Sequence, residues 1–128
     1  MTIRELSNYY YINKQIIQLE SKLEKLEEDL LSSSQITDMP KNSKVNKPTE
    51  ELAIKIAELK EIIVNKRIKL IDEMIAIEKY IDTIPNAEIQ IIIRMRFIEL
   101  KEWDEISAVA DIERTNAYHK LKRYLKKN

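Results

Sequence analysis

Polar and basic side chains recur along one side of the segment from 114 to 128. They are Thr115, Asn116, His119, Lys122, Arg123 and Lys126. On a helix of 3.6 residues per turn these positions lie opposite an apolar stripe. That stripe consists of Ala117, Leu121, Tyr124 and Leu125. Asn offers a donor and an acceptor to adenine, Arg offers a fork to guanine, and Thr and Lys reach phosphates. The spacing therefore predicts a helix whose outer face is suited to double-stranded DNA.

The charge distribution favours the same interpretation, although the chain has 22 basic and 22 acidic side chains and no formal net charge. The segment from 114 to 128 contains no acid, and its bases are Arg114, Lys120, Lys122, Arg123, Lys126 and Lys127. A local basic face is the footprint of a nucleic-acid binder. Cations at a helix C-terminus also complement the helix dipole, and His119 on a polar face is equally compatible with plain solvation.

Two shorter helices should support this one, as in a helix-turn-helix. We expect the first helix of the motif to pack through Trp103, Ile106, Val109 and Ala110. Asp111, Ile112 and Glu113 would form the turn, with Asp111 in the left-handed conformation that Asp tolerates better than most residues. Before them, Pro85 and Asn86 open a helix predicted to reach about Glu99. Its apolar positions are Ile89, Ile92, Ile93, Phe97 and Ile98.

A long helix is predicted at the N-terminus, where Thr2 and Glu5 fit a capping box. Its apolar residues follow an unbroken 3,4 spacing at Tyr9, Ile12, Ile16, Leu19, Leu23, Leu26 and Leu30. With charged residues at flanking positions, this is typical of a coiled-coil seam. The segment from 32 to 48 has two prolines and no period, which indicates a flexible linker.

A second long helix is predicted from Thr49 to Ile84, with Thr49 as its cap and Pro85 ending it. The seam runs through Leu52, Ile56, Leu59, Ile63, Leu70, Met74, Ile77 and Ile81. It is interrupted because Lys66 and Arg67 stand where an apolar residue is due. Such wide apolar stripes favour an antiparallel hairpin, an oligomeric coiled coil, or both.

The segment Phe97-Ile-Glu-Leu-Lys-Glu-Trp-Asp-Glu-Ile-Ser107, with the basic helix ending Leu121-Lys-Arg-Tyr-Leu125, resembles a known family. It is similar to the C-terminal part of ArpU/RinA-like phage late transcriptional regulators, whose last domain resembles region 4 of bacterial sigma factors. In such proteins Gly-Lys-Ser usually precedes the Trp, where this chain has Leu100-Lys-Glu. The resemblance implies a phage or prophage activator of late or packaging genes, with host RNA polymerase as a further partner.

Other functional classes find little support in the composition. The chain has no glycine and no cysteine and has one histidine, so phosphate-cradling loops and Cys/His sites are missing. The carboxylates are spread along helix faces and form no acid/base cluster. We expect no enzyme activity, small-molecule substrate, cofactor or metal. The absence of cysteine and of long apolar runs predicts a cytoplasmic protein with no membrane partner.

These observations predict an all-α chain in which a long helical hairpin or coiled coil precedes a C-terminal helix-turn-helix domain. The expected divisions are 1–31, the N-terminal helix; 32–48, the linker; 49–84, the second long helix; and 85–128, the DNA-binding domain. The first hypothesis is a DNA-binding transcription regulator that self-associates through its long helices. The alternative is a coiled-coil assembly protein, adaptor or inhibitor, such as a packaging component, in which the helix-turn-helix is only structural.

Overall fold

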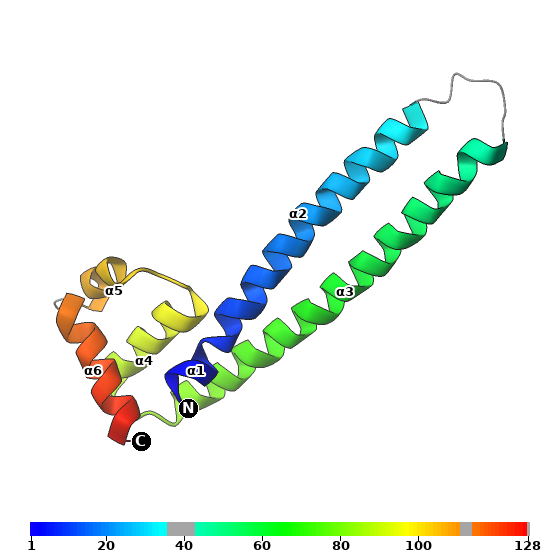
Figure 1. The fold of residues 1–128 in the computed structure, drawn as a ribbon. Helices are drawn as coiled ribbons and strands as arrows, with labels where there is room; N and C mark the ends of the chain where they lie inside the picture. Colours follow the sequence, from blue (N-terminus) through cyan, green and yellow to red (C-terminus); the bar gives the residue numbers. More distant parts are fainter. Residues whose placement is uncertain (36–42, 111–113, 128) are drawn as a thin grey trace. The chain divides into compact units, whose positions relative to one another are not determined.

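The computed structural model describes residues 1–35, 43–110 and 114–127. Within these ranges the chain is helical and contains no strand, which confirms the all-α class. In chain order the elements are α1 (Ile3–Leu6), α2 (Asn8–Gln35), α3 (Ser43–Asp82), α4 (Ala87–Ile93), the π-helix η1 (Arg94–Ile98), α5 (Trp103–Ala110) and α6 (Arg114–Lys127) (Figure 1). The chain divides into two compact units, Lys14–Ile68 and Met1–Asn13 with Lys69–Asn128. No described helix combines the length and apolar character needed to cross a membrane.

The unit Lys14–Ile68 is an antiparallel pair made by α2 and the first part of α3 (Figure 1). The predicted seam positions face inward, because Ile16, Ile56 and Ile63 are buried. The partly buried seam residues of this unit are Leu19, Leu23, Leu26, Leu30, Leu52 and Leu59. The 3,4 spacing therefore predicted which side of each helix is covered.

The interruption of the seam at Lys66 and Arg67 is filled by polar contacts across the helix pair. Lys66 Nζ donates to Gln15 Oε1 at 3.2 Å, and an Arg67 guanidinium nitrogen donates to Glu20 Oε1 at 2.6 Å. The Arg67 and Glu20 side chains remain 56% and 44% exposed, so water screens this ion pair. It should add less than about 1 kcal/mol to stability, and its main effect is to accommodate two cations in an apolar seam.

Both long helices extend into the segment predicted as a linker, 32–48. α2 continues to Gln35 and α3 begins at Ser43, so the predicted boundaries at 31 and 49 were wrong. The reason is that apolar periodicity marks where a helix buries side chains, whereas its backbone can continue past the last buried residue. Residues 36–42 lie outside the described residues, and the flexibility of the linker stays a prediction.

The N-terminal cap forms much as predicted, but the helix after it is not continuous. The Thr2 hydroxyl accepts from the Glu5 backbone N–H at 3.2 Å and donates to Glu5 Oε1 at 3.3 Å. The Glu5 carboxylate thus accepts from the Thr2 hydroxyl, whereas in a capping box it would accept from the Thr2 backbone N–H. A turn at Ser7, whose hydroxyl donates to Ile3 O at 2.7 Å, separates α1 from α2.

The second unit, Met1–Asn13 with Lys69–Asn128, is built around one hydrophobic core. The end of α3 contributes the fully buried Ile77 and Ile81, and Ile84 follows directly after this helix. The helices α1, α4, η1, α5 and α6 each add at least one buried residue. The members are Leu6, Ile77, Ile81, Ile84, Ile89, Ile92, Ile93, Met95, Phe97, Ile106, Ala117 and Leu121. The helix predicted to end near Glu99 supplies the centre of this core, and its predicted apolar positions are buried or partly buried.

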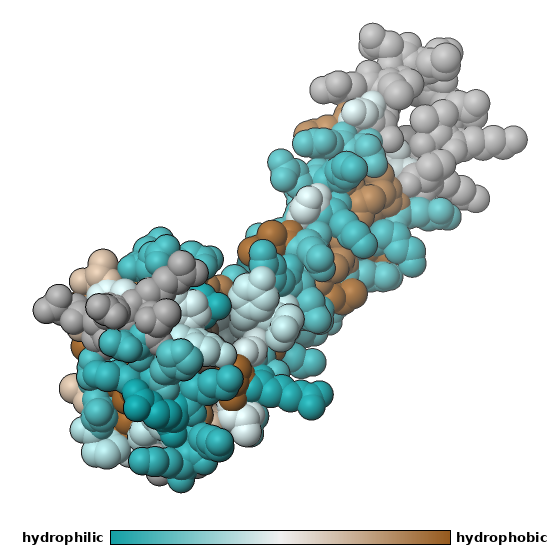
Figure 2. Space-filling view, turned by 60° about the vertical axis from the view of Figure 1, so that its left-hand side comes forward, coloured by the Kyte–Doolittle hydropathy of each residue, from teal (hydrophilic) through white to brown (hydrophobic). Residues whose placement is uncertain are grey.

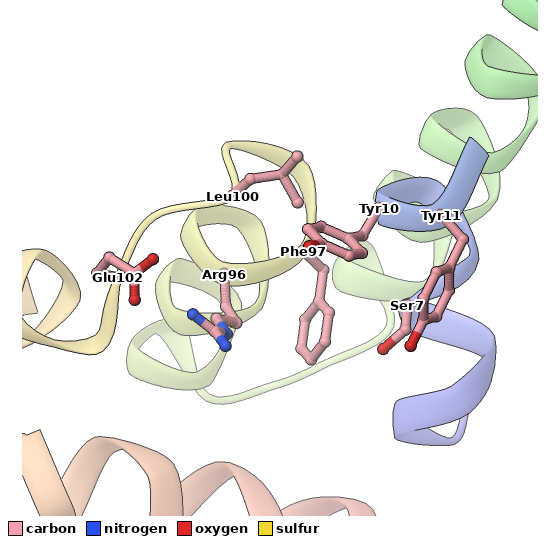
Figure 3. A pocket seen from close by; sticks show the side chains of 7 residues that line it. All are labelled: Ser7, Tyr10, Tyr11, Arg96, Phe97, Leu100 and Glu102. Carbon is pink, nitrogen blue, oxygen red and sulfur yellow. The ribbon is translucent and has the colours of Figure 1, made fainter. Parts of the chain in front are cut away.

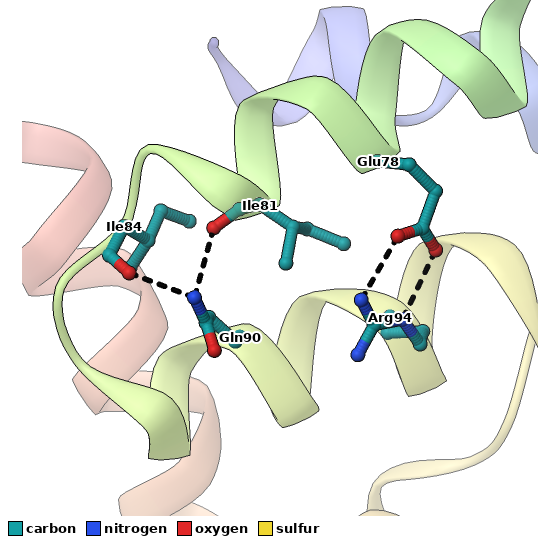
Figure 4. Close-up of polar contacts among 5 residues, drawn as sticks. All are labelled: Glu78, Ile81, Ile84, Gln90 and Arg94. Carbon is teal, nitrogen blue, oxygen red and sulfur yellow. Dashed lines mark hydrogen bonds and ion pairs between the residues drawn. The ribbon is translucent and has the colours of Figure 1, made fainter.

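Polar contacts fix α4 and η1 against the end of α3 (Figure 4). Asn86 caps α4, because its Oδ1 accepts from the N–H groups of Glu88 at 2.9 Å and Ile89 at 3.2 Å. Gln90 Nε2 donates to the carbonyl oxygens of Ile81 at 3.1 Å and Ile84 at 2.8 Å. The Ile81 carbonyl also accepts from the Ile84 N–H at 3.0 Å, so Gln90 ties the end of α3 to α4.

Arg94 and Glu78 form a two-pronged ion pair, with Nε to Oε1 at 3.0 Å and a terminal nitrogen to Oε2 at 2.9 Å (Figure 4). The hydrogen bond between the two side chains lowers the pKa of Glu78 and raises the pKa of Arg94. Nearby, burial raises the pKa of the Tyr80 hydroxyl, with smaller contributions from Tyr124 and Glu5. Because it is paired with Glu78, Arg94 has a structural role within this unit.

The connection from η1 to α5 passes through Leu100, which has a φ of 57°. This is the left-handed region, which costs a residue with a Cβ about 1–2 kcal/mol. The position coincides with the glycine that the resemblance places before the Trp. Arg96 supports the turn, because one guanidinium nitrogen donates to Lys101 O at 3.0 Å and its carbon lies 4.9 Å from the centre of the Trp103 ring.

The inner face of α5 differs from the predicted one at a single residue. Ile106 is fully buried, Trp103 packs against the core, and Ala110 is partly buried, all as expected. Val109 is 66% exposed, so its assignment to the inner face was wrong. With 3.6 residues per turn, a face centred on Ile106 and Ala110 turns Val109 outward. The predicted turn, Asp111 to Glu113, lies outside the described residues.

Candidate nucleic-acid interface

The rotation of α6 is fixed by its apolar side. Ala117 is fully buried and Leu121 is 2% exposed, while Tyr124 and Leu125 pack partly buried against the same core. This is the stripe expected from the sequence. Since one face of α6 is held against the core, the side chains on the opposite face must project away from it.

Five of the six predicted DNA-binding residues have described side chains, and all five are exposed. They are Asn116, His119, Lys122, Arg123 and Lys126. The sixth, Thr115, belongs to the first turn of α6, but its side chain lies outside the described residues. The structure therefore brings the five together on one side of a single helix, with amide, imidazole, ammonium and guanidinium groups available at its surface.

Aromatic contacts hold the first half of this face in place. The Tyr118 ring meets the Trp103 ring edge-on, with centroids 5.4 Å apart and an interplanar angle of 85°. Tyr118 also contacts His119 at 5.5 Å, and Lys122 Nζ lies 5.5 Å from the centre of the Tyr118 ring. Trp103 thus serves both as a core contact and as the support for a tyrosine between two candidate DNA-binding side chains.

Arg123 is partly ordered by its own helix, because its Nε donates to the His119 carbonyl oxygen at a long 3.4 Å. The terminal nitrogens of the guanidinium are the ones that would meet a guanine or a phosphate. Among the described residues, no carboxylate pairs with Lys122, Arg123 or Lys126. These three cations are therefore open to an anionic partner.

Lys120 behaves differently from the other cations of α6. Its Nζ donates to both carboxylate oxygens of Glu88, each at 3.0 Å, and the two side chains are 39% and 34% exposed. Glu88 belongs to α4, 32 residues earlier in the chain, so the acid-free sequence of α6 gave no sign of it. This pairing divides the described cations of α6 into one that is bound to the fold, Lys120, and four that are exposed: Lys122, Arg123, Lys126 and Lys127.

The same unit also has a pocket with no α6 residue in its lining. This pocket of about 380 Å³ is lined by Ser7, Tyr10, Tyr11, Arg96, Phe97, Leu100 and Glu102 (Figure 3). Its hydroxyl and carboxylate groups lack a neighbouring histidine or cysteine that could activate a nucleophile. Among the described residues, no group of three or more His, Cys, Asp or Glu side chains could hold a metal ion. The exposed face of α6 is thus the best-defined candidate site.

Comparisons with protein-family models, with curated proteins and with solved structures found no match. The resemblance to the ArpU/RinA-like regulators accordingly stays a prediction from sequence. The functional argument for this chain depends on the geometry of α6 and on the helices that support it.

Proposed function

We propose that this protein is a DNA-binding transcription regulator that contacts duplex DNA through the exposed face of α6. The observation that carries the proposal is the division of that helix. Ala117 and Leu121 hold it in the core, while Asn116, His119, Lys122, Arg123 and Lys126 are exposed opposite them. A helix of this kind fits a major groove, with Asn116 and Arg123 suited to base edges and the lysines to phosphates.

The remainder of the proposal follows the predicted helix-turn-helix and its resemblance. α5 and α6 would be the two helices of that motif, and α4 with η1 would support them from behind. We further propose that the regulator is phage- or prophage-encoded, cytoplasmic, self-associating through its long helices, and an activator of late or packaging genes that acts near host RNA polymerase.

Charge reversal tests the DNA contact. Lys122→Glu with Arg123→Glu should abolish binding to fluorescent promoter-region duplexes in anisotropy titrations at low salt, because two phosphate-facing cations become anions. A matched control is Lys55→Glu with Lys69→Glu, which changes the charge equally at two exposed positions of α3. The control should bind as wild type does. Helical content by circular dichroism checks that all three proteins are folded.

The assembly-protein alternative has one observation in its favour, a row of exposed isoleucines along α3. A wild-type chain that binds no duplex at low salt, yet associates with itself or with a partner protein, would support that alternative and rule out the regulator. Equal loss of binding in the α3 control would show that overall charge, and not the α6 face, governs the interaction.

A further inference from the structure

α3 carries a second apolar stripe that the antiparallel pair does not cover. Five residues on it are 44–58% exposed: Ile54, Val64, Ile68, Ile71 and Ile75. Figure 2 shows hydrophobic side chains at the surface along the long helical part of the chain. Single exposed apolar residues are normal on a protein surface, but a row of β-branched residues along one helix marks an interaction surface.

The spacing of this second stripe is that of a coiled coil. Ile54, Ile68 and Ile75 occupy one core position of a heptad, and Val64 and Ile71 occupy the other. Ala57, exposed, also belongs to the second position, while Glu61 interrupts the first. Val64, Ile68 and Ile75 each follow a residue of the inner seam by five positions, which is about 140° around a helix of 3.6 residues per turn. Ile54 and Ile71 follow Thr49 and Lys66 at the same interval. One helix therefore has two seams, and the pairing with α2 uses only one.

The charges beside the stripe are sorted by side. Two of the positions that precede Ile54, Glu61, Ile68 and Ile75 are charged, and both are basic: Lys60 and Arg67. Two of the positions that follow Ala57, Val64 and Ile71 are charged, and both are acidic: Glu58 and Asp72. One heptad beyond the stripe, Lys79 takes the same position after Glu78. In a parallel pair each of the two preceding bases meets the residue five positions later on the other chain, so Arg67 meets Asp72 and Lys60 meets Asn65.

An antiparallel pair would give the opposite electrostatics. There the two basic positions would face each other, as would the two acidic ones, and like charges set against each other oppose association. Arg67 remains 56% exposed while it binds Glu20, so its guanidinium still has donors for a second carboxylate. The charges beside residues 54–75 therefore favour the parallel orientation, in which Arg67 meets Asp72.

We propose that a second copy of this chain covers the stripe, with the two α3 helices parallel and in register. This deepens the self-association part of the proposed function and does not depend on DNA binding. A parallel pair carries both C-terminal segments at the same end, which is the arrangement that a duplex with two half-sites requires.

Disulfide trapping tests the orientation, since the native chain has no cysteine. Ile54→Cys and Ile75→Cys are made as separate single variants, because in a parallel pair each position lies opposite itself at a distance that a disulfide can span. Each variant should cross-link to itself under mild oxidation. Self-cross-linking no faster than that of the collision control would overturn the proposal. Efficient cross-linking of Ile54→Cys only when it is mixed with Ile71→Cys, which is at the other core position, would show an antiparallel pair and would also overturn it. Glu24→Cys, at an exposed position of α2, is the control for random collision.

Mass measurement tests the association itself. Light scattering after size exclusion, without DNA and at micromolar concentration, should give at least twice the 15.2 kDa mass of the chain. Ile68→Glu with Ile71→Glu should give a monomer of unchanged helical content, whereas Ile17→Glu, at an exposed apolar position of α2, should not. A monomeric wild type would refute the proposal. The Lys122→Glu, Arg123→Glu variant should still associate, which separates this result from the fate of DNA binding.

Discussion

The salt dependence of DNA binding should distinguish the free cations of α6 from the one bound to Glu88. Each phosphate that a cation neutralises steepens the slope of log affinity against log salt by about 0.9 on B-form DNA, or about eightfold in affinity between roughly 1 M and 0.1 M salt. Lys122→Gln should therefore reduce the slope by about 0.9. Replacing Lys122, Arg123 and Lys126 together should reduce it by roughly 2.7 and weaken binding about 500-fold at 0.1 M salt.

Lys120→Gln is the matched control, because it removes the same charge two residues away on the same helix. Lys120 already has both oxygens of Glu88 at 3.0 Å, so its replacement should leave the slope within error of wild type. The lost ion pair is partly exposed and should lower stability by less than about 1 kcal/mol. Anisotropy titrations at several salt concentrations give the slopes. A Lys120→Gln slope reduced as much as that of Lys122→Gln would refute the division of this helix into bound and free cations.

Three further outcomes follow from the core, from the turn before α5 and from the ion pair between Glu78 and Arg94. Leu121→Ala should cost about 2–5 kcal/mol in urea unfolding because Leu121 is 2% exposed, while Val109→Ala should stay within about 0.5 kcal/mol. Leu100→Gly should be no less stable than wild type, because relief of about 1–2 kcal/mol of left-handed strain offsets the flexibility of glycine; lower stability would contradict this. Glu78 has a lowered pKa, so its ion pair stabilises the fold above pH 4.5 and is lost as the pH falls through the folded pKa. The stability difference between wild type and Glu78→Gln should close over that acid range.

The sequence predicted helix faces better than helix ends. Ile16, Ile56 and Ile63 are buried at predicted seam positions. A long helix pairs through a regular apolar stripe, and the spacing of apolar residues in the sequence determines where that stripe lies. The ends of α2 and α3 are not set by the stripe. Gln35 and Ser43 lie beyond the last seam residues, where no apolar signal remains to mark a boundary.

Local capping was predicted correctly at Thr2, whereas Thr49, also predicted as a cap, lies inside α3. Thr2 and Asn86 both accept from N–H groups two or three residues ahead, which needs only neighbouring residues and no tertiary contact. The π-helical turn η1 had no comparable signal, and the positive φ of Leu100 was indicated only by the glycine that the resemblance places at this position. Both depend on how the chain must bend to bring α5 against a core that residues far apart in the sequence create.

The inner face of α6 was predictable for the same reason as the seams, since Ala117 and Leu121 recur at helical spacing. The open face was predictable only as a set of exposed residues, because exposure does not say which charges are already paired. Glu88 reaches Lys120 only because α4 and α6 pack on one core, and a contact across 32 residues leaves no mark in the local sequence. A count of basic residues on a helix therefore overstates its capacity for phosphates. The cations available to DNA are those that form no ion pair within the described part of the chain. Among the predicted site residues these are Lys122, Arg123 and Lys126.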